Sequence, residues 1–140
     1  MALLAPDPGS ADVIIVDCTD PVGHAGGLFT EAFYRDCLRV LGDDGLLVQQ
    51  SESPLYHMDV INPLRKAMVT AGFRDVTTLF FPQPSYPSGW WTATLAGKQA
   101  LAGRYREADA RNRHFTTGYY NADIHHAALT PPEFFHHALD

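Results

Sequence analysis

The chain has 140 residues, of which 46% are hydrophobic and 19% charged, so it is long enough for one globular domain with a single core. Its formal net charge is −6 and it has no basic run, which argues against nucleic acid as a partner, because phosphate binding depends on clustered Lys and Arg. There is no long apolar run and no signal-like leader, and the two cysteines are too few for a disulfide framework. A cytoplasmic chain that does not enter a membrane is therefore expected.

The first predicted strand follows a lead-in over residues 1–10, and the rest of the chain, residues 11–140, is expected to form one domain. The run Val13 to Val16 is apolar and β-branched with no alternation, which is typical of a strand buried on both faces of a parallel sheet. A loop rich in Gly and Pro comes next. A helix capped by Thr30 should follow, with this apolar stripe at helical spacing: Phe33, Tyr34, Cys37, Leu38 and Leu41.

Residues 42–45, Gly-Asp-Asp-Gly, are expected to form a turn that ends this helix. Residues 46–50 form a second short buried strand in this interpretation. Residues 56–71 have the periodicity of a second helix, which contains Pro63. Two interpretations stay open: either the helix begins at Pro63 with Asn62 as its cap, or its first turns are kinked.

The later part of the chain predicts an antiparallel strand pair at the edge of the sheet, formed by residues 73–81 and 90–96 and joined by a Pro-rich loop. Residues 97–118 should be a surface excursion with one short helix. Residues 119–140 suggest two short helical stretches broken at Pro131 and Pro132. This order of elements indicates an α/β open sheet.

Two carboxylates, Asp17 and Asp20, come directly after the first predicted strand. Ligands of open α/β sheets bind outside the carboxyl ends of the strands, so this pair is a candidate site. The two side chains suit a diamine, since one can accept a proton from the attacking amine while the other holds an ammonium group. From spacing alone, a simple turn before Pro21 and a metal-binding pair are alternatives. The sequence has no G-x-G-x-x-G and no P-loop motif that would cradle a nucleotide.

Five strings of this sequence closely resemble the spermidine synthase family, in the family's order and with compatible spacing. The resemblance covers about residues 11–137, and the strings are DVIIVDCTDPVG (12–23), LFTEAFY (28–34), QSESP (50–54) with His57, YPSG (86–89) and YNADIH (120–125). It implies the C-terminal half of a methyltransferase-like Rossmann domain that ends in an antiparallel strand pair and short helices. It also implies an aminopropyltransferase that moves an aminopropyl group from decarboxylated S-adenosylmethionine to putrescine. Spermidine and methylthioadenosine would be the products, and no metal or further cofactor is expected.

The resemblance assigns roles to particular residues. Asp17 matches the family's proton acceptor, and Asp20 its neighbour that helps to bind the polyamine. Gln50 matches a substrate-pocket amide. Tyr86 matches the tyrosine that lines the amine channel, and Trp91 a bulky apolar side chain beside it. His24 stands where the family usually has proline, at a backbone contact to methylthioadenosine, so that contact is in doubt.

The family's enzymes are about twice as long as this chain, and their donor-binding glycine-rich loop has no counterpart here. Apolar strands without their usual neighbours predict association with a second copy or with a separately encoded N-terminal half. A non-catalytic fragment that binds polyamines or serves in assembly is the alternative to an enzyme half.

Overall fold

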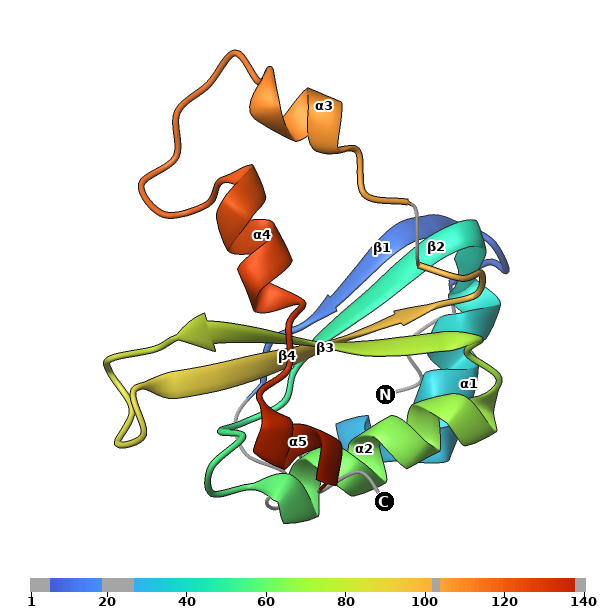
Figure 1. The fold of residues 1–140 in the computed structure, drawn as a ribbon. Helices are drawn as coiled ribbons and strands as arrows, with labels where there is room; N and C mark the ends of the chain where they lie inside the picture. Colours follow the sequence, from blue (N-terminus) through green and yellow to red (C-terminus); the bar gives the residue numbers. More distant parts are fainter. Residues whose placement is uncertain (1–5, 19–26, 102–103, 138–140) are drawn as a thin grey trace.

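The computed structural model describes residues 6–18, 27–101 and 104–137, which form a four-stranded sheet with helices on both sides (Figure 1). The strand order is β1-β2-β4-β3; β1 and β2 are parallel, and β4 is antiparallel to both β2 and β3. The Asp20 and His24 assignments lie outside the described residues. The elements are β1 (Ala11–Val16), α1 (Glu31–Val40), β2 (Leu41–Gln50), α2 (Met58–Ala71), β3 (Asp75–Pro82), β4 (Trp90–Gly97), α3 (Glu107–Arg111), α4 (Ala122–Ala128) and α5 (Glu133–His137).

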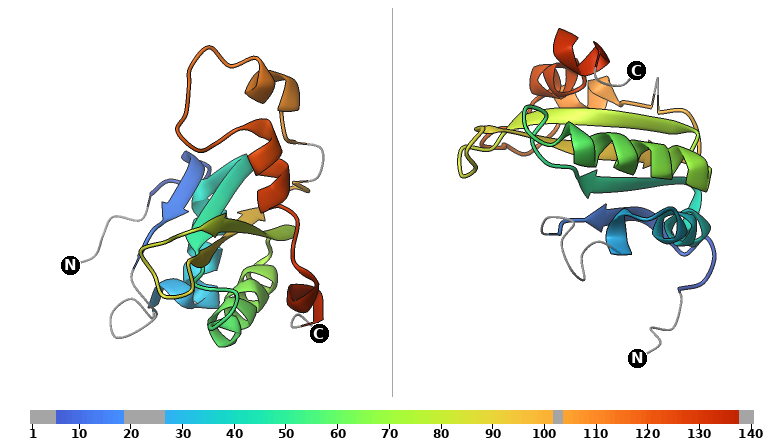
Figure 2. Two further views of the ribbon diagram at one scale, coloured as in Figure 1. Left: turned by 60° about the vertical axis from the view of Figure 1, so that its left-hand side comes forward. Right: turned by 90° about the horizontal axis from the view of Figure 1, so that it is seen from below.

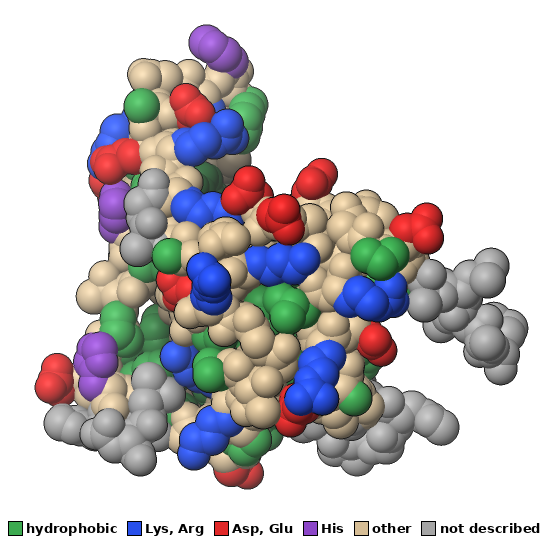
Figure 3. Space-filling view, turned by 90° about the vertical axis from the view of Figure 1, so that its right-hand side faces the viewer, with side chains coloured by type: hydrophobic (Ala, Val, Ile, Leu, Met, Phe, Trp, Pro, Cys, Tyr) green, Lys and Arg blue, Asp and Glu red, His purple; other side chains and the backbone are tan. Residues whose placement is uncertain are grey.

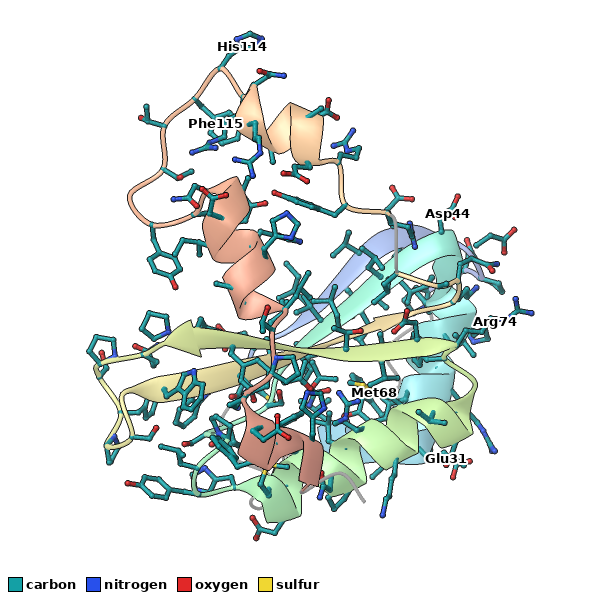
Figure 4. The ribbon with its side chains drawn as sticks, viewed as in Figure 1. Glu31, Asp44, Met68, Arg74, His114 and Phe115 are labelled. Carbon is teal, nitrogen blue, oxygen red and sulfur yellow. The ribbon has the colours of Figure 1, made fainter. Side chains whose placement is uncertain are left out.

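Helices α1 and α2 cover one face of the sheet, and the main core lies between them and the strands (Figure 1). The Thr30 hydroxyl caps α1 by accepting a hydrogen bond from the Phe33 amide, as the sequence predicts. Met68 points from α2 toward the sheet (Figure 4). The buried residues of this core are Val16, Tyr34, Cys37, Leu41, Leu47, Leu64, Met68, Ala71, Phe73 and Ala96.

Two details of the helices and their connections differ from the sequence expectations. Helix α2 begins at Met58 and runs through Pro63, so the start at Pro63 capped by Asn62 is wrong. The predicted turn at residues 42–45 belongs to β2 as a bulge, because Ala11 pairs with Leu41 whereas Val13 pairs with Leu46. A Cβ on Gly45 would lie 2.8 Å from the Leu41 Cβ, so the close fold of this bulge requires glycine.

The strands are not buried on both faces, which corrects the expectation from their unbroken apolar runs. Side chains of the sheet alternate between the α1–α2 side and the opposite side, which we call the open face. Val13 and Ile15 on the open face of β1 are 55% and 72% exposed, because no described element covers them. The residues of the open face are Val13, Ile15, Leu46, Val48, Gln50, Thr77, Leu79, Phe81, Trp91, Ala93 and Leu95.

The C-terminal segment crosses the sheet from one side to the other. Helices α3 and α4 stand over the open face, where α4 packs against β3, and α5 returns to the α2 side (Figures 1 and 2). There Phe135 packs edge-on against Phe80 with ring centroids 4.9 Å apart. The predicted antiparallel pair, the single short helix of the excursion and the two short tail helices are therefore all present. Among the described residues, no helix is long and apolar enough to cross a bilayer.

Candidate active site

A pocket of about 720 Å³ opens on the open face at the carboxyl ends of β1 and β2. It collects residues from β1, β2, β4 and the β3–β4 hairpin, which are far apart in the sequence. Four of the predicted site residues, Asp17, Gln50, Tyr86 and Trp91, line it together. The other lining residues are Ile15, Val16, Cys18, Val48, Phe81, Gln83 and Ala93.

Asp17 is the one charged side chain among the described residues that line this pocket, and it is exposed. The chain leaves β1 at Val16, so the Asp17 carboxylate lies just beyond the strand end, where open α/β sheets bind ligands. The opposite end of the molecule instead carries acidic and basic side chains interspersed (Figure 3). A single carboxylate in a largely apolar pocket suits a cationic ligand with a methylene chain.

Tyr86 and Trp91 form an aromatic wall of the pocket. Their rings stack with centroids 4.3 Å apart and planes inclined by 22°. Trp91 is buried and comes from β4, whereas Tyr86 is 48% exposed in the hairpin. Stacking on the buried indole fixes the orientation of the exposed tyrosine ring. The faces of aromatic rings pack well against methylene groups and attract an ammonium group.

Gln50 lines the pocket, but both ends of its side-chain amide are hydrogen-bonded to other groups of the protein. Its Nε2 donates to the Cys18 carbonyl at 3.0 Å and to Glu52 Oε1 at 2.9 Å. Its Oε1 accepts from the Trp91 Nε1 at 2.7 Å and from the Glu52 amide at 3.1 Å. A side-chain amide offers two donors and two acceptor lone pairs, so Gln50 ties the loop after β1 to Trp91 and to the loop after β2.

Gln50→Leu is expected to destabilise the chain by about 1–3 kcal/mol, because it leaves the Trp91 indole N–H and the Glu52 amide without their acceptor. Urea denaturation followed by tryptophan fluorescence measures this change. The matched control is Gln83→Leu, since Gln83 lines the same pocket. Equal unfolding midpoints for the two variants would show that the Gln50 bonds contribute nothing to stability.

Glu52 is a residue to which the sequence interpretation gave no role. It is only 2% exposed and has a left-handed backbone with φ of 70°, which is uncommon for a residue other than glycine. Its Oε2 lies 3.5 Å from Nδ1 of His57, and its carbonyl accepts from the Thr92 amide at 2.8 Å. The signal available in the sequence was a carboxylate inside the family string at residues 50–54.

Glu52 also affects the electrostatics of the pocket. Burial, with smaller contributions from the Asp17 and Glu52 carboxylates, raises the pKa of the Cys18 thiol. Cys18 therefore stays protonated near neutral pH and is a poor nucleophile.

On the other face of the sheet, which α1 and α2 cover, burial raises the pKa of Tyr34. The Tyr34 hydroxyl donates a hydrogen bond to Gln49 Oε1 at 2.8 Å.

The histidines do not form a metal site within the described part of the chain. No group of three or more His, Cys, Asp or Glu side chains converges there in a way that could hold a metal ion. His125 stacks on Tyr105 with centroids 3.8 Å apart and lies 3.2 Å from the Tyr120 hydroxyl. His126 lies 3.4 Å from Glu107. The contact between His126 and Glu107 joins α4 to α3.

Comparison with known proteins identifies the protein family of this chain. The spermine/spermidine synthase domain matches residues 4–106, and the chain therefore belongs to the spermine/spermidine synthase family. The polyamine aminopropyltransferase of Methylococcus capsulatus is 60% identical over 96% of this chain, and that of Thioalkalivibrio sulfidiphilus is 59% identical over 94%.

Solved structures agree with this membership. A spermidine synthase in complex with the transition-state analogue AdoDATO superposes with a TM-score of 0.88 at 30% identity, and covers 95% of this chain. The spermidine synthase of Thermotoga maritima superposes with a TM-score of 0.84. The fold is thus part of a methyltransferase-like Rossmann domain. The chain spans about half the length of the curated relatives it matches, 47% for both relatives above.

Proposed function

We propose that this chain carries the amine-binding and proton-accepting side of an aminopropyltransferase site. The observation that carries the proposal is the pocket that joins Asp17 to the stacked Tyr86 and Trp91 rings. A diamine such as putrescine places its methylenes against the aromatic wall. Its cationic end is held by a carboxylate, for which Asp20 is proposed, and its neutral end faces Asp17.

The reaction is a displacement at carbon. The lone pair of the neutral amine attacks the propyl carbon of decarboxylated S-adenosylmethionine, and the carbon–sulfur bond breaks with its electron pair moving to the positive sulfur. The leaving group is the neutral thioether methylthioadenosine. The new ammonium nitrogen then loses a proton to the Asp17 carboxylate. The positive sulfonium already activates the leaving group, so the protein's part is to orient the reactants and accept one proton.

The site needs a donor-binding side, which we propose comes from a second copy or from a separately encoded N-terminal half. A backbone contact from His24 to the methylthioadenosine product is part of the same proposal. Both cysteines of the chain, Cys18 and Cys37, are free thiols, which supports a reducing compartment such as the cytoplasm. A second candidate function is a non-catalytic polyamine-binding or assembly module, which the same pocket would serve.

A domain-replacement chimera tests the proposed function. In it, this chain replaces the matched part of the Methylococcus capsulatus relative. We expect calorimetry to give about 10- to 100-fold tighter binding of putrescine than of pentylamine, because one charge-assisted hydrogen bond contributes about 1.5–3 kcal/mol. Pentylamine is the matched control, with a methyl group in place of the second amine. Equal affinities would contradict a diamine site.

A further inference from the structure

The tip of the β3–β4 hairpin, residues 81–91, extends beyond the end of β2 (Figure 1). Strand β2 pairs with β4 as far as Gln50, which lies opposite Ala93, and the loop after β2 still exchanges backbone hydrogen bonds with Thr92. Within the described part of the chain, the strand pairs of the tip itself lie between β3 and β4 alone. A two-stranded hairpin is at best marginally stable in water unless another element packs against it. The position of the tip therefore depends on what its two faces contact.

The two faces of this hairpin have different partners. On the open face, Tyr86 and Trp91 form the aromatic wall of the pocket that contains Asp17, which we call the amine pocket. On the opposite face lie Phe80 and Trp90, with ring centroids 5.9 Å apart. Successive side chains of a strand point to opposite faces of the sheet. Whatever packs behind Phe80 and Trp90 therefore also sets the position of the aromatic wall.

Helix α5 packs behind the hairpin. Phe135 is 2% exposed and meets Phe80 edge-on, with ring centroids 4.9 Å apart and planes inclined by 89°. Phe134 meets Trp90 in the same way at 5.8 Å. Edge-to-face pairs of this kind are a favourable arrangement of aromatic rings. Phe80 and Phe135 also form a small core with Ile61 of α2, separate from the main core, so the hairpin is supported by a helix of only five residues.

The C-terminal segment also holds β3 from the open face. Helix α4 packs there against β3, which is the last strand in the order of the sheet. The chain then passes Pro131 and Pro132 and reaches the α2 side, where the Phe135 amide donates to the Pro132 carbonyl at 2.9 Å (Figures 1 and 2). The segment thus passes around the β3 end of the sheet, and α5 is the part that lies behind the amine pocket.

We propose that Phe135 is a positioning residue for the amine site. Phe135 does not line the pocket, but its ring fills the space behind Phe80 and so fixes the hairpin. The Tyr86 and Trp91 rings then keep their place in the same pocket as Asp17. Without the Phe135 ring the tip opens, and the methylenes of a bound diamine lose their packing surface. This inference rests on the proposed function, because it names a residue that orients the same site.

Hydrogen exchange of this chain tests the support of the hairpin. The tip contains protected amides, because Gln83 donates to the Gly89 carbonyl and Gly89 donates to the Tyr86 carbonyl, both at 2.9 Å. Phe135→Ala is expected to raise the exchange rates of these amides by about 10-fold. The matched control is Leu64→Ala, since Leu64 is also buried but belongs to the main core. It should leave the tip amides near their parent rates, because the tip opens without breaking that core. Equal exchange of the tip amides in the two variants would overturn the support by α5.

Putrescine binding to the domain-replacement chimera tests the consequence for the amine site. Phe135→Ala is expected to raise the dissociation constant and the KM for putrescine about 10-fold, with turnover at saturation near that of the parent chimera, because Asp17 is untouched. Phe135→Leu keeps most of the apolar volume and should restore most of the affinity. If Phe135→Ala does not fold, Phe134→Ala replaces it, since Phe134 is 40% exposed and packs on Trp90. It should change the affinity in the same direction by a smaller factor.

The outcomes separate this inference from a general loss of stability and from the proposed function. If Leu64→Ala weakens putrescine binding as much as Phe135→Ala does, Phe135 has only a structural role. Unchanged putrescine affinity of Phe135→Ala, together with faster exchange of the tip amides, would also overturn the positioning role. A parent chimera that binds putrescine no better than pentylamine would refute the proposed function, and the exchange rates would still decide whether α5 supports the hairpin.

Discussion

Asp17→Asn is expected to lower the turnover of the domain-replacement chimera by about 10²–10⁴-fold, the usual effect of losing a general base. Asparagine keeps the shape of the side chain but cannot accept the amine proton. Because Asp17 is exposed at the end of β1, the substitution should leave the unfolding midpoint unchanged. The measurement is the rate of spermidine formation at saturating donor and amine, with thermal unfolding of the same samples.

Asp12→Asn is the matched control for this prediction. Asp12 is an exposed carboxylate on β1, the strand directly before Asp17, and does not line the pocket, so its loss should leave turnover near that of the parent chimera. Asp20→Asn is expected mainly to weaken amine binding, since its proposed role is to hold the ammonium group. Near-normal turnover of Asp17→Asn at neutral pH would show that Asp17 is not the base, and the family membership would still hold.

Leu47→Ala is expected to reduce the free energy of unfolding by about 2–5 kcal/mol, because it removes a fully buried side chain and leaves a cavity. Leu47 lies in β2 and is part of the core cluster that also contains Tyr34, Leu64 and Met68. Urea denaturation of this chain gives the change as a lower midpoint, or as loss of the cooperative transition if the remaining stability is small.

Leu55→Ala is the control for the core prediction. Leu55 is 49% exposed in the loop before α2, and substitutions at such positions usually change stability by less than about 0.5 kcal/mol. If the two leucine variants unfold at the same urea concentration, the packing of β2 against α1 and α2 is not what holds this sheet together.

The sequence by itself determined the elements and their order. The apolar run at residues 13–16, the Thr30 cap and the Pro-rich hairpin loop are local signals, because a strand, a helix start and a turn each depend on residues a few positions apart. The resemblance to the family predicted Asp17, Gln50, Tyr86 and Trp91 as site residues, although their positions span much of the chain. Spacing alone left a simple turn as an alternative for the Asp17–Asp20 pair.

Tertiary structure decided what those local signals could not. Strands β1 and β2 are buried on one face because α1 and α2 cover that face. The bulge at residues 42–45 follows from the pairing of β2 with β1. Likewise, the hydrogen bond from the Trp91 Nε1 to the Gln50 amide and the one from the Thr92 amide to the Glu52 carbonyl depend on β4, which lies about forty residues further along the chain. Contacts between such distant residues are set by the order of the strands in the sheet, which local patterns a few residues long do not fix.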